Sequence, residues 1–531
     1  LNESNQPLII SMPLKDDLLY FQAFKKRIQD VELYLLDTNL EINNSCFRNI
    51  TDKLYGGDRE HRLQQEILLG IGGVKLLQTL NIEPNFIHIN EGHAAFALLE
   101  WHKNNAINNI KSFKQTIENN KYNALFTTHT PVKHGNEVFS KDLITQYFNN
   151  YFSETDLTLE DFLEFGSDSA VIDSEISHSL IAKNNLENDD FSMTLLAFNL
   201  CSNYNGVSKL HGEVSRELWK GAFKKENSNE VPIKSITNGV DIKYWTSNSI
   251  VELLNKQNIA NYSYLIDNKE IYDSFIDIDD IDLSNVRQEL RNNLIEFIRK
   301  SYRLNKPAFI KRDKFKSFDE ILDNKVLTIG FSRRFAKYNR ADLLFGDIVR
   351  LKSILYNVNY PVQFVFSGKA HPLDTEGKEM LRKVIKFITD NHLEKKIVFL
   401  ENYDLKTAKY IVQGCDVWLN NPIKPLEASG TSGMKSALNG GINLSIADGW
   451  WAEAFNHRNG YIIEDSKNDD LTADNIYKII ESDIVHNFYD ARTSWIKMMK
   501  ESMFTAFTQF GSCRMVNDYN ELFYKKPKKL S

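Results

Sequence analysis

The sequence predicts an α/β fold whose C-terminal part is a doubly wound parallel sheet, and three observations support this. Short apolar runs recur along the chain, segments with helical spacing separate them, and polar residues follow several of the runs. A parallel strand is buried on both faces, so it reads as a continuous apolar run. The expected strands are Val326–Phe331, Val362–Phe366, Lys396–Leu400, Asp416–Leu419 and Ile442–Ile446.

Helices are expected between these strands. Asp342–Leu355 places Leu, Ile and Val at helical spacing, and Glu376–Ile388 is a charged amphipathic segment. Strands that alternate with such helices indicate βα repeats. Ligands of these sheets bind beyond the C-terminal ends of the strands, so the polar residues there are the first candidates for a site.

The first half of the chain predicts a second, less regular α/β unit. Its expected strands are Asn85–Ile89 and Ala124–Thr127, each followed by a polar segment with a histidine, and Ala94–Asn104 is an expected helix between them. The next stretch, rich in Asn, Asp and Lys, has helical patches such as Asn285–Tyr302. We therefore expect an α/β domain over 1–245, a helical connection over 246–325, and an α/β domain with terminal helices over 326–531.

Composition excludes several classes of function. The 531 residues carry 64 basic and 71 acidic side chains without a dominant basic run, so no nucleic-acid partner is expected. No apolar stretch is long enough to span a membrane. The four cysteines form no CxxC pair, which argues against a zinc site and favours a reducing cytoplasm. The chain opens with Leu1 and has no signal peptide, so we expect a fragment or a processed chain.

The segment Glu427–Lys435 has the strongest local signal for chemistry. Small and hydroxyl residues, Thr431 and Ser432 among them, form a loop before an expected helix, and free N–H groups at a helix start attract phosphate. Lys435 falls in the first turn, where the helix dipole disfavours the ammonium form and so favours Schiff-base chemistry. Loop and lysine together fit an aldehyde cofactor that carries a phosphate. An ordinary turn with a surface lysine explains the spacing about as well.

A group of cations follows the strand Val326–Phe331. Arg333 and Arg334 come first, and Lys337 and Arg340 lie a few residues later. Several cations at a strand end suit the binding of phosphate groups, and this position favours function over a solvated helix start.

Histidines and asparagines follow strands in the first half. His88, Glu91 and His93 lack the spacing of a metal-binding helix, so no metal is expected, and hydrogen bonding to a polyhydroxyl ligand fits them and His129 better. A structural role is the commoner one for a single histidine. Asn238, in an Asn-Gly pair, indicates a turn first. Gly70–Gly73 invites interpretation as a phosphate loop, but helical spacing flanks it and no strand precedes it.

The segment EASGTSGMKSALNG, from Glu427 to Gly440, resembles the pyridoxal-phosphate segment of the α-glucan phosphorylases at every diagnostic position. Ten further segments resemble the family in the same order and cover nearly the whole chain. They are LYGGDREHRLQQEILLGIGG near Leu54, HINEGHAAFALLE near His88, TTHTP near Thr127, NGVSKLHGEVSRELW near Asn205, ITNGV near Ile236, GKAHP near Gly368, FLENYD near Phe399, DVWLNNP near Asp416, DGWW at Asp448–Trp451 and RMVNDY near Arg514. The residues of these segments are most similar to those of the shorter bacterial and archaeal branch of the family.

The resemblance implies two Rossmann-like domains that face a central cleft, the GT-B arrangement. The family's early glycine-rich loop lies ahead of the first matching segment, so we expect a truncated N-terminal domain. The implied reaction transfers one glucose from the non-reducing end of an α-1,4-glucan (glycogen, starch or maltodextrin) to inorganic phosphate, with retention, giving glucose 1-phosphate. A homodimer is expected by analogy alone.

The resemblance also implies roles for single residues. Lys435 would carry pyridoxal 5'-phosphate covalently, and the phosphate of this cofactor would exchange a proton with the substrate phosphate. Arg333, Thr431 and Ser432 match positions around the cofactor phosphate, and Tyr403 matches one beside its ring.

Substrate positions are matched as well. Arg334 matches a ligand of the substrate phosphate, which places it with Lys435, Arg333 and His129 among the expected catalytic residues. Positions that bind or flank the sugar hydroxyls are matched by His129, Asn238, Glu427, Ser429 and Gly430.

One departure from the family pattern concerns phosphate binding. Family members usually have a lysine after the tyrosine that follows the arginine pair, whereas Asn339 follows Tyr338 here. With that cation and the glycine-rich loop both missing, a non-catalytic glucan-binding remnant stays open beside the phosphorylase. A nucleotide-sugar glycosyltransferase of the same architecture would need no Schiff-base lysine. An aminotransferase would need a group that anchors an amino-acid carboxylate.

Overall fold

The structure is a computed structural model that describes residues 7–54, 57–132, 136–167, 190–259, 261–304, 307, 317–370, 374–401 and 403–525. Parts of three family-like segments, Tyr55–Gly56, His371–Pro372 and Asn402, lie outside the described residues. The chain divides into two compact units. Unit 1 comprises Leu1–Val207, Gly212–Ser235 and Asn520–Ser531, and unit 2 comprises Ser208–His211 and Ile236–Tyr519.

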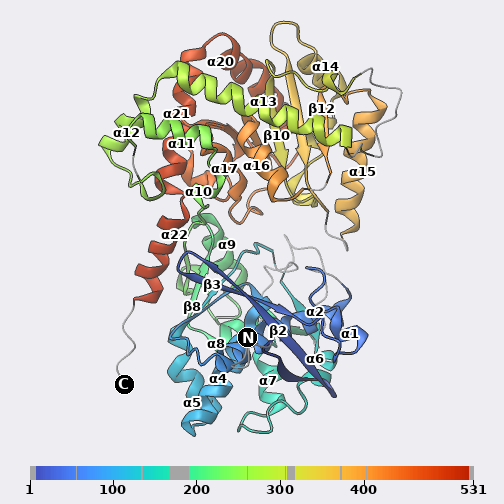
Figure 1. Cartoon of the computed structure of the whole chain (residues 1–531), viewed down its shortest axis with the longest axis vertical. Helices are drawn as coiled ribbons and strands as arrows, with labels where there is room; N and C mark the ends of the chain where they lie inside the picture. The colour runs from blue at the N-terminus through green and yellow to red at the C-terminus, as the bar shows by residue number, and fades with distance from the viewer. Residues whose placement is uncertain are drawn as a thin grey trace. The chain divides into compact units, whose positions relative to one another are not determined.

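Unit 2 is built on a six-stranded parallel sheet with the order β12-β11-β10-β13-β14-β15 (Figure 1). Its strands are β10 Leu327–Ser332, β11 Val362–Ser367, β12 Ile397–Leu400, β13 Val417–Asn420, β14 Ile442–Ile446 and β15 Gly460–Ile463. Counted along the chain, this order is 3-2-1-4-5-6, which is that of a doubly wound dinucleotide-binding sheet. The five predicted strands are confirmed, and β15 was not predicted.

The strands of unit 2 are buried because helices cover both faces of the sheet. Every residue of β10 to β14 is buried, which only a sheet packed on two sides allows. The helices of unit 2 are α10 Ile242–Trp245, α11 Asn248–Lys256, α12 Lys269–Ile276, α13 Asp280–Leu304, α14 Ile348–Leu355, α15 Thr375–Asp390, α16 Leu405–Gly414, α17 Thr431–Ala437, α18 Trp451–Ala454, α19 Asp469–Ile479, α20 Val485–Tyr489, α21 Arg492–Gln509 and α22 Ser512–Tyr519.

The predicted helices of unit 2 are confirmed with shifted ends. Asn285–Tyr302 lies within α13, and Glu376–Ile388 lies within α15. The segment predicted as a helix over Asp342–Leu355 instead begins with a 3-10 turn, and only Ile348–Leu355 is α-helical. Asp347 caps this later start, because its side chain accepts a hydrogen bond from the Arg350 N–H.

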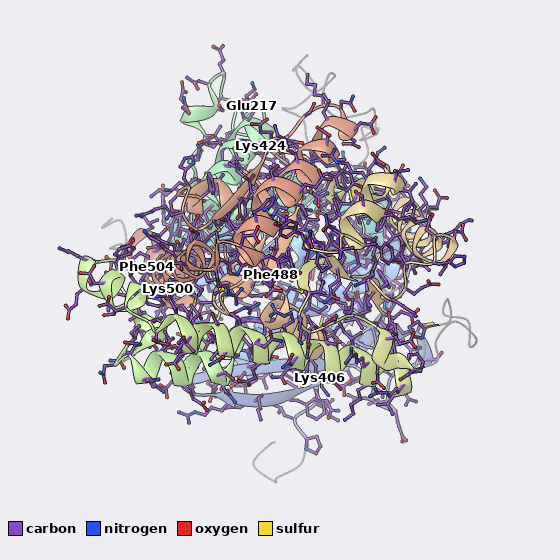
Figure 2. The ribbon with its side chains drawn as sticks, turned by 90° about the horizontal axis from the view of Figure 1, so that it is seen from above. Glu217, Lys406, Lys424, Phe488, Lys500 and Phe504 are labelled. Carbon is purple, nitrogen blue, oxygen red and sulfur yellow. The ribbon has the colours of Figure 1, made fainter. Side chains whose placement is uncertain are left out.

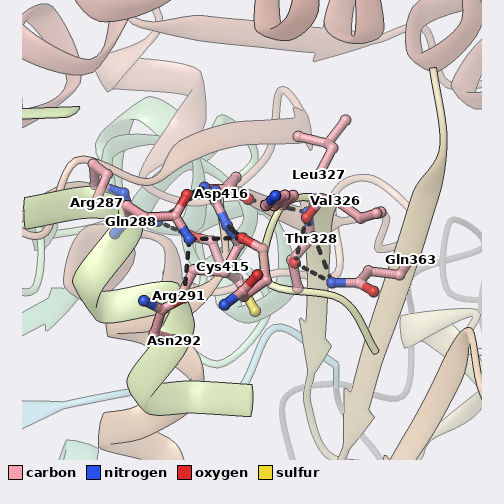
Figure 3. A network of polar contacts seen from close by, with 12 residues as sticks. Arg287, Gln288, Arg291, Asn292, Val326, Leu327, Thr328, Gln363, Cys415 and Asp416 are labelled. Atoms are coloured by element: carbon pink, nitrogen blue, oxygen red, sulfur yellow. Dashed lines mark hydrogen bonds and ion pairs between the residues drawn. The ribbon is translucent and has the colours of Figure 1, made fainter. Parts of the chain in front are cut away.

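A buried ionic network ties the N-terminal ends of β10 and β13 to α13 (Figure 3). Asp416 precedes β13, and its carboxylate accepts hydrogen bonds from the Thr328 N–H at 3.0 Å and from Arg291, with Arg287 at 3.4 Å. The three charged side chains are 2–3% exposed. This network fixes the strands at the edge of the sheet opposite to their C-terminal ends.

Helix α21 packs against α12 through both apolar and polar contacts. Phe504 packs edge-on against Tyr272 with ring centroids 5.1 Å apart. The Lys500 ammonium donates to the Ile276 carbonyl at 2.8 Å and to Asp280 at 2.6 Å. Figure 2 labels Phe504 and Lys500 on this helix. The helical segment after residue 246 is therefore held to unit 2.

Unit 1 contains a four-stranded parallel sheet with the order β4-β5-β8-β9. These strands are β4 Ile87–Asn90, β5 Ala124–Thr127, β8 Asn203–Gly206 and β9 Ile233–Ser235. The two predicted strands, over 85–89 and 124–127, are confirmed as β4 and β5. The predicted helix over 94–104 is confirmed within α4, and β8 and β9 were not predicted.

Two antiparallel sheets and the remaining helices complete unit 1. The strands are β1 Ile10–Leu14, β2 Asp17–Ile28, β3 Val31–Asp37, β6 Val138–Ser140 and β7 Asp190–Ser192. The helices are α1 Ser45–Arg48, α2 Arg59–Ile67, α3 Gly73–Thr79, α4 Ala95–Asn109, α5 Phe113–Asn120, α6 Lys141–Phe148, α7 Leu159–Phe165, α8 Met193–Leu200 and α9 Lys209–Trp219. A π-helix over Leu68–Gly72 joins α2 to α3, so the glycines there lie in a helix and form no phosphate loop.

Among the described residues, no helix combines the length and the apolar character that crossing a membrane requires. All four cysteines are unpaired.

Candidate functional site

Two candidate side chains meet at the point where the strand order of unit 2 reverses. Arg333 directly follows β10, and Asn420 ends β13, the strand beside β10 on the other side of the reversal. The Arg333 guanidinium donates a hydrogen bond to the Asn420 side-chain oxygen. Open α/β sheets bind their ligands at this reversal, because the loops on either side of it part there.

Arg333 also forms an ion pair with Glu427, and both side chains are 9% exposed. Burial lowers the pKa of the Arg333 guanidinium to about 10, which leaves it cationic at neutral pH. A buried pair of this kind is costly to break, because either partner alone would be an uncompensated charge. We call Arg333, Asn420, Glu427 and Asp448 the switch-point cluster.

Asp448, which follows β14, holds the loop that carries Glu427. Its two carboxylate oxygens accept hydrogen bonds from the Glu427 N–H at 2.9 Å and the Gly449 N–H at 2.8 Å. The Ser429 carbonyl accepts from the Trp450 N–H at 2.8 Å. Burial raises the pKa of Asp448 to about 7, so this carboxyl titrates near neutral pH.

Two glycines allow these loops to approach so closely. Gly430 has φ +78°, and a Cβ there would lie 3.2 Å from the Glu427 carboxyl carbon. Gly449 has φ +51°, and a Cβ there would lie 2.4 Å from the Ser429 carbonyl oxygen. Residues other than glycine rarely adopt such φ values, so glycine is required at both positions for this loop geometry.

Helix α17 begins immediately after Gly430 and carries Lys435. The Trp418 indole N–H of β13 donates to the Ser432 hydroxyl at 3.1 Å, and the Asn443 amide of β14 donates to the Gly433 carbonyl at 3.2 Å. These contacts fix α17 against the two central strands, on the chain segment that also carries the Glu427 loop.

The Lys435 ammonium lies over the Trp245 ring, 4.2 Å from its centroid. No carboxylate among the described residues forms an ion pair with it. Burial lowers the pKa of Lys435 from its usual range. An amine that loses its proton more easily is a better nucleophile toward an aldehyde. The sequence predicted Lys435 in the first turn and assigned this effect to the helix dipole, but Lys435 lies in the last turn of α17, where the dipole favours the ammonium form. Burial is therefore the cause of the lowered pKa.

The other cations after β10 have different environments. Arg334 is exposed and has no ion-pair partner in the part of the chain that the structure describes. Asn339 is 1% exposed, and its amide donates to the Arg334 carbonyl at 2.8 Å. Arg340 is buried and paired with Asp465 at 2.9 Å. The sequence grouped Arg340 with the phosphate-binding cations, but its ion pair makes it part of the scaffold.

Tyr403 and Asn238 occupy separate places in unit 2. Burial raises the pKa of the Tyr403 phenol, and a contact with the Ser332 hydroxyl partly offsets this, which places Tyr403 beside the end of β10. The Asn238 carbonyl accepts a hydrogen bond from Arg514 at 3.2 Å. Among the described residues, no hydrogen bond of the Asn238 side chain joins it to the switch-point cluster.

His129 belongs to unit 1 and sits in a cluster of its own. Its backbone N–H donates to the Glu91 carboxylate at 2.5 Å, and its Nε2 lies 2.9 Å from the Asn90 side-chain oxygen. The Thr130 hydroxyl donates to the same Glu91 oxygen at 2.8 Å. Burial lowers the pKa of His129, so its ring is neutral at pH 7. We call Asn90, Glu91, His129 and Thr130 the His129 cluster.

The backbone of Glu91 is strained. Its φ is +61°, in the region that side chains other than glycine rarely adopt. Strain of this kind persists where the surrounding contacts hold it, and it concentrates at binding sites. Here the contacts are the hydrogen bonds to residues 129 and 130, at the C-terminal ends of β4 and β5.

A second polar cluster of unit 1 has the ligand types of a metal site. One ligand atom each from Glu66, His93 and Glu137 lies within 4.8 Å of the others. The Arg62 guanidinium pairs with Glu66 at 2.9 Å and with Glu137 at 3.2 Å. Since a cation already bridges the carboxylates, the group is an ionic cluster of the protein itself.

Comparison with known proteins identifies the family. The model of the carbohydrate phosphorylases matches residues 57–459. The chain belongs to the carbohydrate phosphorylase family. It is 37% identical over 537 residues to the maltodextrin phosphorylase of Thermococcus litoralis, which covers 99% of this chain and 61% of that protein.

Two glycogen phosphorylases are similar to a comparable degree. That of Aquifex aeolicus is 36% identical over 528 residues, covering 97% of this chain and 73% of that protein. That of Mycobacterium tuberculosis is 33% identical over 549 residues, covering 99% and 61%. The chain thus spans about three fifths of the length of the Thermococcus and Mycobacterium phosphorylases.

Three residues that contact the predicted residues were not singled out from the sequence. Asn420 and Asp448 lay only within family-like segments, and Trp245 lay in none of them. Glu91 was already indicated together with His88 and His93. Asn420 and Asp448 lie at or just beyond the C-terminal ends of β13 and β14, so the strand-end rule applied to every strand would have found both. Trp245 is far from Lys435 in sequence and carries no local signal.

Proposed function

We propose that the chain is an α-1,4-glucan phosphorylase that uses pyridoxal 5'-phosphate. It would transfer the terminal glucose at the non-reducing end of glycogen, starch or maltodextrin to inorganic phosphate, with retention, and release glucose 1-phosphate. Family membership supports this reaction. The observation that carries the proposal is Lys435, an amine with a lowered pKa and, among the described residues, no carboxylate partner, on the helix that follows the arginine-paired Glu427 loop.

The residues around Lys435 fit a cofactor that carries a phosphate. Helix α17 begins at Gly430 without a side-chain cap, so its first N–H groups are open to an acceptor. The Ser429 hydroxyl is buried and has no hydrogen-bond partner among the described residues. Lys435, Thr431, Ser432, Arg333 and Tyr403 would hold the cofactor. When bound, it supplies a phosphate group that can exchange a proton with the substrate phosphate.

The cationic residues have separate tasks in this proposal. Arg333 would offset the charge between two phosphate groups that would otherwise repel each other. Its own carboxylate partner, Glu427, must then turn to the sugar hydroxyls, which fits the position of Glu427 beside Gly430. Arg334, exposed and without an ion-pair partner among the described residues, would bind the incoming phosphate.

The sugar-binding groups would act as the glycosidic bond breaks. The C1–O bond to the glucan breaks, the glycosidic oxygen takes a proton, and a new C1–O bond to phosphate forms. Positive charge builds on the sugar ring, and an adjacent phosphate stabilises it. We propose that the sugar hydroxyls are bound by Glu427, Ser429, Gly430, Asn238 and His129. A neutral His129 ring suits this role, since it can both donate and accept a hydrogen bond.

Cellular context belongs to the same proposal. Four unpaired cysteines fit the reducing cytoplasm, where glucans and phosphate are available. A two-domain GT-B arrangement and a homodimer are inferred from the family alone. We also retain the division at residues 245 and 325 as a prediction.

The decisive experiment is an assay for glucose 1-phosphate. The full chain is incubated with maltodextrin, inorganic phosphate and pyridoxal 5'-phosphate, and Lys435→Ala is expected to abolish the product. Lys406→Ala is the matched control, because Lys406 is an exposed lysine of neighbouring α16 (Figure 2). Glucose 1-phosphate from Lys435→Ala, or release of UDP with elongation of maltodextrin from UDP-glucose in the absence of phosphate, would overturn the proposal.

A glucan-binding protein without turnover is the second candidate, and Asn339 favours it. The side chain at this position is buried and bonds to the Arg334 carbonyl, so it offers no cation to phosphate. Retention on an amylose column without glucose 1-phosphate release would decide for this second function.

A further inference from the structure

The Asn439 side chain connects the helix that carries Lys435 to the segment that carries Trp245. Asn439 follows α17 and is 0% exposed. Its amide nitrogen donates to the Trp245 carbonyl at 3.0 Å and to the Lys435 carbonyl at 2.9 Å. Its amide oxygen accepts from the Ser247 N–H at 2.8 Å. Both donors and one acceptor site are therefore used, all within this one junction.

The backbone of Asn439 is itself anchored. Its carbonyl accepts a hydrogen bond at 2.8 Å from Arg287, which also donates to the Gln413 carbonyl at 2.5 Å and the Cys415 carbonyl at 2.7 Å. Figure 3 shows Arg287 on α13 beside Cys415 and Asp416. The Asn439 amide thus projects from a rigid point that joins α13, the end of α16 and the start of β13.

The segment that Asn439 holds has little structure of its own. Trp245 ends α10, a helix of only four residues, and helices this short are unstable without tertiary contacts. The Asn439 amide contacts its backbone on both sides of residue 246. The Gln413 amide also donates to the Trp245 carbonyl, at 3.2 Å. The Asn439 amide and this contact together fix the Trp245 ring, whose centroid lies 4.2 Å from the Lys435 ammonium.

We propose that Asn439 is a positioning residue for Lys435: its amide holds the Trp245 ring against the ammonium group and so keeps water from it. This inference rests on the proposed function only for the role that it gives to Lys435, because all the contacts that support it are between residues of this chain. Burial is the cause of the lowered Lys435 pKa, so loss of the ring's position should raise that pKa toward the usual value.

Asn439→Ala tests the proposal with Asn459→Ala as a matched control. Asn459 is also 0% exposed and donates to the Ala454 carbonyl at 2.7 Å and the Thr505 hydroxyl at 3.2 Å. It accepts from the Asn456 N–H at 3.2 Å, so both variants lose two donated bonds and one accepted bond. Alanine is preferred to aspartate, whose charge would itself raise the pKa of a nearby lysine.

The readout is the pH dependence of acetylation of Lys435, followed by mass spectrometry of its peptide on the full chain without cofactor. Asn439→Ala is expected to move the midpoint upward, with about a tenfold slower reaction at neutral pH for each unit of pKa. Asn459→Ala is expected to keep the wild-type midpoint at a comparable loss of thermal stability. Coincident midpoints for Asn439→Ala and wild type would overturn the proposal.

A second variant tests the route through Trp245. In a Trp245→Leu background, where the ring is absent, Asn439→Ala should no longer move the Lys435 midpoint. The same shift in both backgrounds would show that Asn439 acts by another route. None of these measurements requires glucose 1-phosphate formation, so failure of the proposed function is recognised separately.

Discussion

The switch-point cluster of unit 2 and the His129 cluster of unit 1 both lie at the C-terminal ends of parallel strands, yet they differ in charge. In the first, a buried arginine pairs with the Glu427 carboxylate, and Asp448, which follows a third strand, accepts a hydrogen bond from the Glu427 N–H. The second holds a neutral histidine, an amide and a hydroxyl around Glu91. In the proposed function, the same position in two sheets serves the recognition of anions in one unit and of hydroxyl groups in the other.

Arg333→Ala should have the largest effect on stability and activity, because it removes the cation that distinguishes the switch-point cluster from the His129 cluster. The variant leaves Glu427 as a buried carboxylate without its cation, which costs about 3 kcal/mol of stability. Loss of the cation between two phosphates should lower kcat/KM for phosphate about 100- to 1,000-fold. Initial rates of glucose 1-phosphate formation and denaturant unfolding measure the two effects.

The control for Arg333 is Arg350→Ala. Arg350 lies on α14 and forms an ion pair with Glu481 at 2.7 Å. This ion pair is not part of the candidate site. Its removal should leave the KM for phosphate unchanged. Equal kinetic losses in both variants would mean that Arg333 acts only through stability.

His129→Ala sharpens the comparison from the side of unit 1. Removing a hydrogen-bonding group for the sugar should lower kcat/KM for maltodextrin about 30-fold. The KM for phosphate should stay within about twofold, because the His129 cluster includes no cation. A loss confined to phosphate would contradict the assignment of hydroxyl recognition to this cluster.

Arg334→Ala separates the two neighbouring arginines. Arg334 is exposed and has no ion-pair partner in the described part of the chain, so its loss should not affect the free energy of unfolding. The KM for phosphate should rise about tenfold, which is the effect of one charge-assisted hydrogen bond. An unfolding midpoint that drops as far as that of Arg333→Ala would show that Arg334 is part of the scaffold.

Asp448→Asn should change the pH dependence of stability. Burial raises the folded-state pKa of Asp448 to about 7, while an unfolded aspartate has a pKa of about 3.9. The folded state therefore retains a proton that the unfolded state has lost, and stability falls as pH rises from about 4 to 7. Asp448→Asn should lose this fall, on the order of 2 kcal/mol, in denaturant titrations at pH 5 and pH 8.

The wild-type protein provides the comparison for that experiment. Its unfolding midpoint should drop between pH 5 and pH 8 by more than that of the variant. Parallel pH profiles would mean that Asp448 ionises below this range in the folded protein.

The sequence predicted the central strands of unit 2 to within about one residue because each is buried on both faces. Leu327–Ser332 and Ile442–Ile446 are buried throughout and carry Leu, Ile or Phe at every second position, a pattern that is visible in the sequence alone. Strands β8, of sequence NYNG, and β9, of sequence IKS, were missed because they are short and polar, and because β8 depends on pairing with β5 and β9 on pairing with β8. Their strand character comes from tertiary contacts rather than from local pattern.

The sequence predicted single residues of the candidate site but not which of them contact each other. Lys435 and Arg333 had local signals in their own segments. The hydrogen bond between Arg333 and Asn420 joins residues 87 positions apart, and nothing local indicates it. Likewise, helical spacing could not show that Arg340 pairs with Asp465 instead of facing a ligand.

The carboxylate of Asp416, shared between Arg287 and Arg291, constrains how this protein can be altered. Replacing Asp416 would leave two guanidinium groups without their carboxylate in an interior that excludes water, whereas replacing either arginine would leave one ion pair. Single-site libraries would therefore recover only wild type at position 416, whereas simultaneous exchange of all three for apolar residues could succeed. Engineers who wish to redesign the sheet should vary the trio as one unit.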